Sequence, residues 1–440
     1  MSSYKRKKTP GNTDWFVHDR FGMFIHFGLY SLPARHEWIK RKESISEEHY
    51  QKYFDHFNPD LLDAREWAKR AKAAGMKYAV LTTKHHEGFC LFDSKYTEYK
   101  STNTPYGKDV VKEYVEAFRA EGLKVGLYYS LIDWHHPEYP LDITHPRRND
   151  ADAAEIDRGR NMKVYAQYVR DQVTELLTNY GKIDILWFDF SFGPSPEAPE
   201  WMQFGGGKGK DEWESEKLIS LVRSINPEII VNDRAQIPQD LVTPEQEASA
   251  VALKDKETGE LLTWETCQTM SGSWGYNRDE SSWKTPKMLV DMLVKTVSRG
   301  GNLIMNVGPT SRGYFDSRAC AALDVYRDWM RVNSRSIYGC TVAEPEFTVP
   351  EGIYLTQSED ESRLYLHVVD YPYQSLIIDL PEERVDYVQL LQDGSELQWK
   401  PQLTFNAAGD ITSSKALIKL PGAVFNSIDP VIEVFLKPKK

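Results

Sequence analysis

Residues 182–189 read KIDILWFD, a run that is apolar almost throughout and ends in a carboxylate. Runs of this kind are typical of parallel strands that are covered on both faces of a sheet. A charge in such a setting costs several kcal/mol unless it is paired, hydrogen-bonded or neutralised. The sequence therefore predicts a buried strand here. Asp189 at its end must have a partner that stabilises its charge, and its position calls for a functional explanation.

The same pattern recurs along the first three quarters of the chain. Apolar runs resembling 182–189 occur at 22–27, 77–83, 124–130, 228–233, 262–267 and 302–307. Amphipathic segments lie between them, and two have apolar residues at helical spacing: Leu61, Ala64, Trp67, Ala68 and Ala71 in one, and Val111, Tyr114, Val115 and Phe118 in the other. Alternating buried strands and helices predict an α/β fold of the (β/α)8-barrel type, closed by a long helix at 316–335.

The pattern changes beyond residue 341. The runs become short and rich in β-branched residues, at 363–369, 375–380, 385–391, 415–420 and 431–436. Turn signals such as Asp393-Gly394 separate them. This predicts an antiparallel β-sandwich, so we expect a catalytic barrel at 1–340 and a β-sandwich at 341–440.

Composition narrows the functional classes. A net charge of −11 argues against nucleic acid as a partner. No segment approaches the roughly 18 to 20 apolar residues of a membrane span, so no membrane association is expected. The cysteines Cys90, Cys267, Cys320 and Cys340 are scattered singly, and no apolar stretch follows the basic N-terminus. We therefore expect reduced thiols and a cytoplasmic location.

Polar residues gather where the predicted strands end. In barrel enzymes the reacting groups lie at the carboxyl ends of the strands. The candidates at these ends are His26, His85, His86, Tyr128, Asp189, Asn232, Asp233, Arg234 and Glu265. Any one of them could be a helix cap or a hydrogen-bonded core group, but polar residues occur at this position on six strands.

The candidates favour carboxylate chemistry over the alternatives. No GxSxG elbow is present, and no HxH or HExxH spacing indicates a metal site. His85 and His86 should point to opposite sides of a strand, so they are not expected to share an ion. Carboxylates with neutral hydrogen-bond donors and aromatic surfaces suit glycoside hydrolysis, in which Asp189 can stay ionised beside Arg234.

At these same positions the chain resembles the α-L-fucosidases of glycoside hydrolase family 29. The matching pieces, which follow one another in order through most of 14–345, are 15–28 (WFVHDRFGMFIHFG), Glu37-Trp38, 82–97, 125–130, 185–189, 231–234, 264–267 with 273–280, and 300–309. The resemblance implies a retaining exo-α-L-fucosidase that needs no cofactor or metal and acts on fucosylated oligosaccharides or glycoconjugates. It implies that Asp189 is the nucleophile. It further implies a fucose pocket formed by His26, Glu37, Trp38, His85, His86, Tyr128, Trp187 and Arg234.

The acid/base residue is predicted less directly. Glu245, in the stretch VTPEQE at 242–247, resembles the acid/base of one branch of the family. Glu265, which follows an apolar strand, is the runner-up, and Glu247 is third. The Thr-Pro-Glu stretch also resembles the branch that prefers α-1,3/1,4-linked, branched fucose. Two alternatives stay open: a related retaining glycosidase for a galactose-like sugar, and a sugar-binding protein without turnover.

Overall fold

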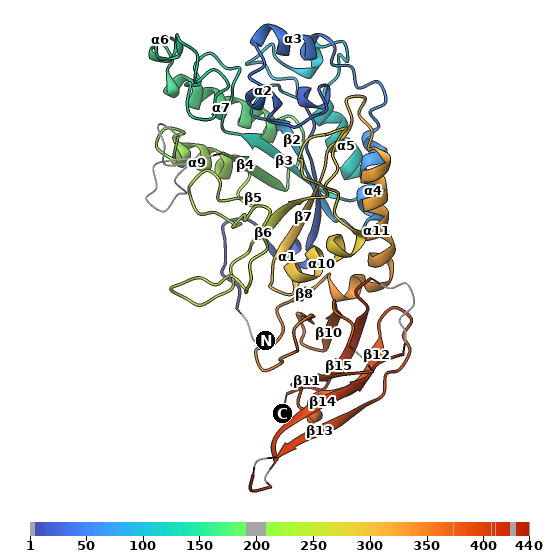
Figure 1. Cartoon of the computed structure of the whole chain (residues 1–440). Coiled ribbons are helices and arrows are strands. Elements are labelled where there is room, and N and C mark those ends of the chain that lie inside the picture. Colours follow the sequence, from blue (N-terminus) through green and yellow to red (C-terminus); the bar gives the residue numbers. More distant parts are fainter. Residues whose placement is uncertain are drawn as a thin grey trace.

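The structure is a computed structural model that describes residues 5–190, 208–372, 374–405, 407–409, 411–422 and 428–439. A curled parallel sheet surrounded by helices forms the larger part, and two antiparallel sheets follow toward the C-terminus (Figure 1). Within the described ranges, no helix is both long and apolar enough to cross a lipid bilayer.

The parallel sheet contains the seven predicted strands. They are β1 (Phe21–Ile25), β2 (Tyr78–Lys84), β3 (Lys124–Ser130), β4 (Ile185–Asp189), β5 (Ile230–Val231), β6 (Glu265–Thr269) and β7 (Asn302–Val307). Their order is β5-β4-β3-β2-β1-β7-β6, and all neighbours pair in parallel. Almost every strand residue is buried, as expected for a sheet with both faces covered.

The prediction of eight regular strands is only partly right. Between β5 and β6, where an eighth strand would lie, residues 241–245 form only isolated parallel bridges. Leu241 bridges to Asn232, Val242 to Trp264, and Glu245 to Cys267. Pro244 has no backbone N–H to give to a ladder, which explains why this segment is not a regular strand. The described part is thus a curled seven-stranded sheet whose edges are linked by this segment.

Helices cover the outer face of the parallel sheet (Figure 1). They are α1 (Asp14–Asp19), α2 (Ile39–Lys42), α3 (Glu47–Asp55), α4 (Ala64–Ala73), α5 (Val110–Ala120), α6 (Ala153–Arg158), α7 (Met162–Thr178), α9 (Ser215–Ile225), α10 (Pro286–Val297) and α11 (Ser317–Asn333). The predicted apolar face of α5 is buried. Leu61, assigned to the face of α4, instead precedes the helix and is 48% exposed, because Asp63 caps the helix at Ala64.

Two antiparallel sheets make up the C-terminal part. Their orders are β12-β15-β10-β9-β8 and β11-β14-β13. The strands are β8 (Cys340–Thr341), β9 (Ile353–Ser358), β10 (Arg363–Val368), β11 (Ser375–Ile378), β12 (Val385–Leu390), β13 (Trp399–Phe405), β14 (Ile411–Lys419) and β15 (Val431–Leu436). Three of these, β8, β9 and β13, were not predicted. The first has two residues, and β13 contains Pro401, which is tolerated because β13 is an edge strand.

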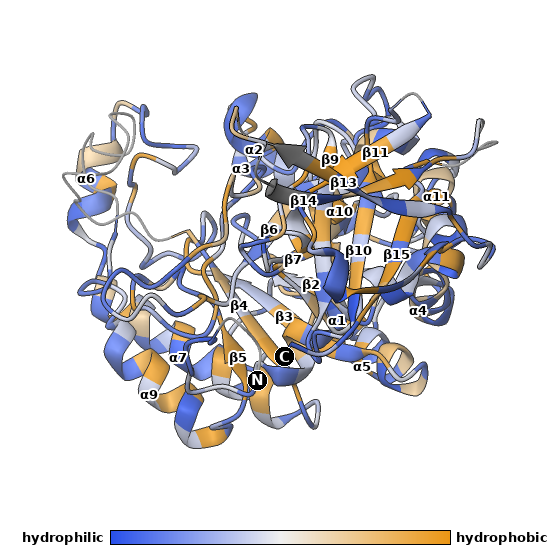
Figure 2. Ribbon diagram, turned by 90° about the horizontal axis from the view of Figure 1, so that it is seen from below, coloured by the Kyte–Doolittle hydropathy of each residue, from blue (hydrophilic) through white to orange (hydrophobic). Residues whose placement is uncertain are grey.

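Apolar side chains from both C-terminal sheets form one buried cluster, and the ribbons of β10 and β15, which contribute to it, contain several hydrophobic segments (Figure 2). Tyr365, Leu391 and Val431 instead join the core of the larger part. Trp329 of α11 donates its indole N–H to the carbonyl oxygen of Ile428 at 3.0 Å. The C-terminal sheets therefore pack against the barrel helices. The predicted boundary at residue 340 falls inside β8, which already pairs with β9.

Candidate active site

A pocket opens at the carboxyl ends of the parallel strands. Its lining comprises Phe24, His26, Glu37, Trp38, His85, His86, Tyr128, Trp187, Asp189, Phe190, Glu245, Cys267 and Trp274. Nine of the residues singled out in the sequence are in this lining. Arg234 lies directly behind it, against Asp189, whereas Glu247 and Glu265 do not line it. The structure thus brings most of the predicted site together.

Asp189 is the last residue of β4 and is held from two sides. Tyr128 of the neighbouring strand donates its hydroxyl to Oδ2 at 2.8 Å, and Arg234 Nη1 donates to Oδ1 at 2.9 Å. Burial raises the pKa of Asp189 to about 6, although Arg234 opposes this shift. The partners of the buried charge, which the sequence required, are therefore an arginine and a tyrosine.

Arg234 joins two carboxylates. The same Nη1 that contacts Asp189 also lies 2.9 Å from Glu245 Oε2. Thr243 fixes the guanidinium, because its hydroxyl accepts from Nε and its carbonyl from Nη2, each at 3.2 Å. The side chain of Glu245 is 44% exposed, whereas that of Asp189 is 13% exposed. Asp189 is therefore the more enclosed of the two carboxylates, and Glu245 faces the open side of the pocket.

Three histidines form a neutral, polar wall. His26 Nδ1 lies 2.6 Å from Asn306 Oδ1, and His86 Nδ1 lies 2.8 Å from Ser130 Oγ. Burial lowers the pKa of His26 to about 3 and the pKa values of His85 and His86 well below the ordinary value. Neutral imidazoles can donate to or accept from hydroxyl groups without adding charge beside Asp189.

The expectation that His85 and His86 point to opposite sides was wrong. Their ring centroids are 3.9 Å apart, and both line the pocket. The pairing of β2 shifts register after Thr82 and the strand ends at Lys84, so strand alternation no longer applies to the two histidines. No cluster of three or more metal-ligating side chains occurs in the described part of the chain.

Glu265 lies beneath the pocket rather than in it. It is the first residue of β6 and fully buried, and it accepts hydrogen bonds from Tyr78 Oη at 2.5 Å and from Trp187 Nε1 at 3.2 Å. Burial raises its pKa to about 7. Because Trp187 separates it from the cavity, the geometry argues against Glu265 as a proton donor to a bound ligand. Glu247 is exposed and absent from the lining.

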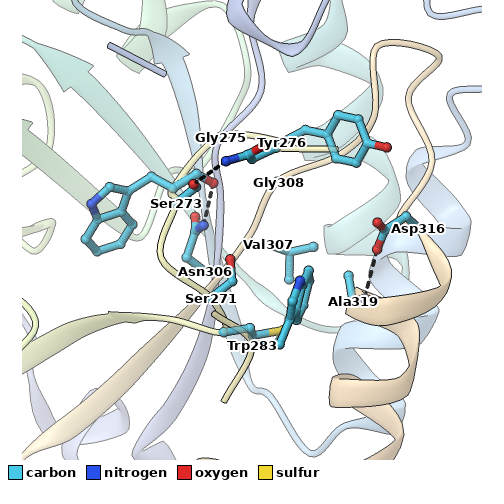
Figure 3. Close-up of a pocket in the computed structure, with 13 residues that line it drawn as sticks. Ser271, Ser273, Gly275, Tyr276, Trp283, Asn306, Val307, Gly308, Asp316 and Ala319 are labelled. Atoms are coloured by element: carbon cyan, nitrogen blue, oxygen red, sulfur yellow. Dashed lines mark hydrogen bonds between the residues drawn. The ribbon is translucent and has the colours of Figure 1, made fainter. Parts of the chain in front are cut away.

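Glu37 acts on the wall of the pocket through backbone groups. Its Oε2 accepts from the N–H groups of Trp274 and Gly275, at 3.2 and 3.0 Å. From the other side Asn306 Nδ2 donates to the Trp274 carbonyl at 2.6 Å, and Figure 3 shows Asn306 reaching this turn. The turn that carries Trp274 is thus clamped between two buried side chains.

Sequence reasoning missed five residues of this site. Phe24, Phe190, Cys267 and Trp274 line the pocket, and Asn306 orients both His26 and the turn at Trp274. A signal existed for four of them, because Phe24, Cys267, Trp274 and Asn306 lie in stretches that match the family. Phe190 lies just outside these stretches, and sequence alone cannot separate such an apolar side chain from a core residue.

Comparisons with known proteins agree with this geometry. The sequence model of the family described as Alpha-L-fucosidase matches residues 2–335. The plasma alpha-L-fucosidase of Homo sapiens is 30% identical over an alignment of 417 residues, which covers 88% of this chain and 82% of that protein. The solved structure of alpha-L-fucosidase isoenzyme 1 from Paenibacillus thiaminolyticus has a TM-score of 0.84 and 42% identity, and the match covers 97% of this chain and 99% of that one.

A second solved structure is similar over both whole chains. It is a trapped covalent intermediate of a GH29 alpha-L-fucosidase from Bacteroides thetaiotaomicron in complex with 2-fluoro-fucosyl fluoride. Its TM-score is 0.78, its identity is 27%, and the match covers 100% of each chain.

Proposed function

Because this chain belongs to the alpha-L-fucosidase family, we propose that it removes terminal α-L-fucosyl residues from glycans with retention of configuration. Asp189 is the nucleophile and Glu245 the acid/base. The covalent intermediate trapped in the similar Bacteroides thetaiotaomicron enzyme supports the retaining pathway.

The observation that carries this proposal is the pair of carboxylates on Arg234. Asp189 Oδ1 and Glu245 Oε2 each lie 2.9 Å from Nη1, so the two oxygens are within about 6 Å of each other. Retaining glycosidases need their two carboxyl groups roughly 5–5.5 Å apart, whereas inverting enzymes leave more room for a water. The separation favours retention.

The reaction then has two displacements. Asp189 attacks the anomeric carbon, and the bond to the glycosidic oxygen breaks while Glu245 gives that oxygen a proton. Glu245, now a carboxylate, takes a proton from water, and the water oxygen displaces Asp189 from the sugar. Tyr128 and Arg234 hold Asp189 in place through both steps, and the neutral histidines bind hydroxyl groups of the sugar.

The shape of the pocket supports exo action on one small sugar. The pocket is narrower than the groove beside it, and aromatic rings surround it. Phe24 and Trp274 supply apolar surface for the methyl group of fucose, where galactose carries a hydroxyl. A hydroxyl left without a partner there would be rejected. We expect kcat/KM for an aryl α-L-fucoside to exceed that for the corresponding galactoside.

Two finer proposals follow the same family likeness. The Thr243-Pro244-Glu245 stretch supports a preference for branched, α-1,3/1,4-linked fucose, which turnover of linkage isomers would test. The shared apolar cluster of the C-terminal sheets supports their packing as a β-sandwich that braces the barrel.

Time-resolved proton NMR with an activated aryl α-L-fucoside tests the proposal. We expect α-L-fucose to appear first and β-L-fucose to follow by mutarotation. If β-L-fucose appeared first, the reaction would be inverting and Asp189 would activate a water instead. No release of fucose from any aryl or branched fucoside would overturn the activity itself.

A further inference from the structure

A second, wider cavity adjoins the catalytic pocket. This groove has a volume of about 660 Å³, against about 40 Å³ for the pocket, and the two share Glu37, Trp38 and Trp274 in their linings. Glu245 lines the pocket and Gln246, the next residue, lines the groove. Because Glu245 protonates the departing oxygen in the proposed reaction, the departing sugar must lie on this side.

The groove offers aromatic surface and side-chain hydrogen bonds. Trp38 and Trp274 are both partly exposed on its rim, as suits stacking on sugar rings. Gln246 Nε2 donates to Thr269 Oγ1 at 3.0 Å, which fixes the amide on the groove wall. Gln246 also has a positive φ of 56°, so its backbone is held in a conformation that few non-glycine residues adopt.

Two lysines line the groove, although the protein as a whole has a net charge of −11. Lys42, at the end of α2, and Lys284, just before α10, both line it. Lys42 Nζ lies 2.7 Å from His36 Nε2, and Lys284 Nζ donates to the Thr269 carbonyl at 2.5 Å. Lys42 is exposed and Lys284 is half-buried, and within the described residues neither lysine forms an ion pair.

The nearby carboxylates are already engaged. Glu37 accepts from two backbone N–H groups and lies 3.2 Å from His36 Nδ1. Glu280 accepts from Ser273 and Ser282, and Glu245 pairs with Arg234. Burial lowers the pKa of Lys284, while Glu280 opposes that shift. The two ammonium groups therefore remain available to an anion that enters the groove.

We propose that this groove binds the sugar that carries the fucose, and that Lys42 and Lys284 adapt it to an acidic sugar bearing a sulfate ester or a carboxylate. The inference rests on the proposed fucosidase activity, since it describes the leaving group of that reaction. The overall charge of −11 would by itself disfavour such a substrate, so a preference for one must come from local groups.

The test compares kcat/KM for three branched fucosides: a neutral one, the same glycan with a sulfate ester, and the same glycan with a sialic acid. We expect the wild-type ratio of acidic to neutral substrate to exceed one and to fall as salt is added. The anion that gives the higher ratio identifies the natural substituent. A ratio of one or less for both anions, or a ratio that rises with salt, would overturn the proposal.

Variants test whether the two lysines cause the preference for an acidic substrate. Lys42→Met and Lys284→Met should each lower the acidic-to-neutral ratio about two- to fivefold, as expected for partly exposed ion pairs. Lys284→Arg keeps the charge and should keep the ratio, which separates charge from the bond to Thr269. Lys69→Met, on the exposed side of α4, removes the same charge elsewhere and should leave the ratio unchanged. An unchanged ratio in both groove variants would contradict the assignment. Turnover of a simple aryl fucoside tests the fucosidase activity separately.

Discussion

Two carboxylates of the parallel-sheet part, Asp189 and Glu265, both have raised pKa values but lie in different places. Burial raises the pKa of the first to about 6 and of the second to about 7. Asp189 ends β4 and faces the pocket, whereas Glu265 begins β6 and lies under Trp187. Because the strands are parallel, the last residue of β4 and the first residue of β6 lie at opposite edges of the sheet.

Their partners differ as well. Asp189 contacts a permanent cation, Arg234, and a tyrosine. Glu265 contacts only neutral donors, Tyr78 and Trp187, and forms no ion pair among the residues described. A perturbed pKa alone would nominate both for catalysis. Two further criteria distinguish the carboxylates: a group proposed to react faces the pocket and has a cationic partner, as Asp189 does. Glu265 has neither and instead positions its neighbours.

Replacing Asp189 should have the largest effect. Asp189→Gly removes the nucleophile, so we expect kcat to fall by about four orders of magnitude or more. Added azide should restore part of the rate by attacking the anomeric carbon from the vacated side. Steady-state kinetics with an aryl fucoside provides the measurement, and wild-type-like turnover in this variant would remove Asp189 from the mechanism.

Replacing Glu245 should have a large effect that depends on the leaving group. Glu245→Gln cannot give up a proton, so poor leaving groups should slow by about 10² to 10⁴-fold. Activated aryl fucosides need little protonation and should slow much less. The matched control is Glu247→Gln, on the same segment but outside the pocket. Equal slowing of both substrate types would assign the acid/base elsewhere.

The pH dependence of kcat/KM should report Asp189. The nucleophile must be ionised, and its pKa is raised to about 6. We therefore expect kcat/KM to fall about tenfold per pH unit below an apparent pKa near 6. Glu245→Gln should keep this acid limb, because Asp189 is unchanged in that variant. An acid limb near pH 4 would mean that burial does not raise the pKa of Asp189.

Replacing Glu265 should affect catalysis least and stability most. Glu265→Gln keeps the shape but faces an indole N–H and a hydroxyl with only one acceptor, so we expect a loss of about 1–3 kcal/mol in unfolding free energy. The fall in kcat/KM should be about tenfold or less, through misplacement of Trp187. Urea unfolding and kinetics of Glu265→Gln and Tyr78→Phe should show the same pattern.

The sign of the pH effect on stability also follows from Glu265. Its pKa of about 7 in the fold exceeds the ordinary 4.5, so the folded protein binds this proton more tightly than the unfolded chain. The contribution is complete below pH about 4.5 and is lost as pH rises through 7. The stability advantage of wild type over Glu265→Gln should shrink by about 3 kcal/mol across this range. A constant difference would show that Glu265 is ionised throughout.

Much of this could be predicted from the sequence. The seven parallel strands follow from apolar runs, and both Trp187 and Asp189, two positions apart on β4, line the pocket. The site residues came mainly from the family likeness. Two features could not be predicted because they depend on long-range contacts. One is the set of isolated bridges that residues 241–245 form with neighbouring segments, and the other is the pair of hydrogen bonds by which Glu37 and Asn306 hold the turn at Trp274. The register shift at the end of β2 likewise reversed a local argument about His85 and His86.

The identity of the nucleophile is tested most directly by labelling the protein with 2-fluoro-fucosyl fluoride and mapping the modified peptide by mass spectrometry. The labelled side chain should be Asp189 at the end of ILWFD, in wild type and, accumulating further, in Glu245→Gln. A label on Glu245 or Glu265, or turnover of fucosides with no covalent adduct in either protein, would contradict the account.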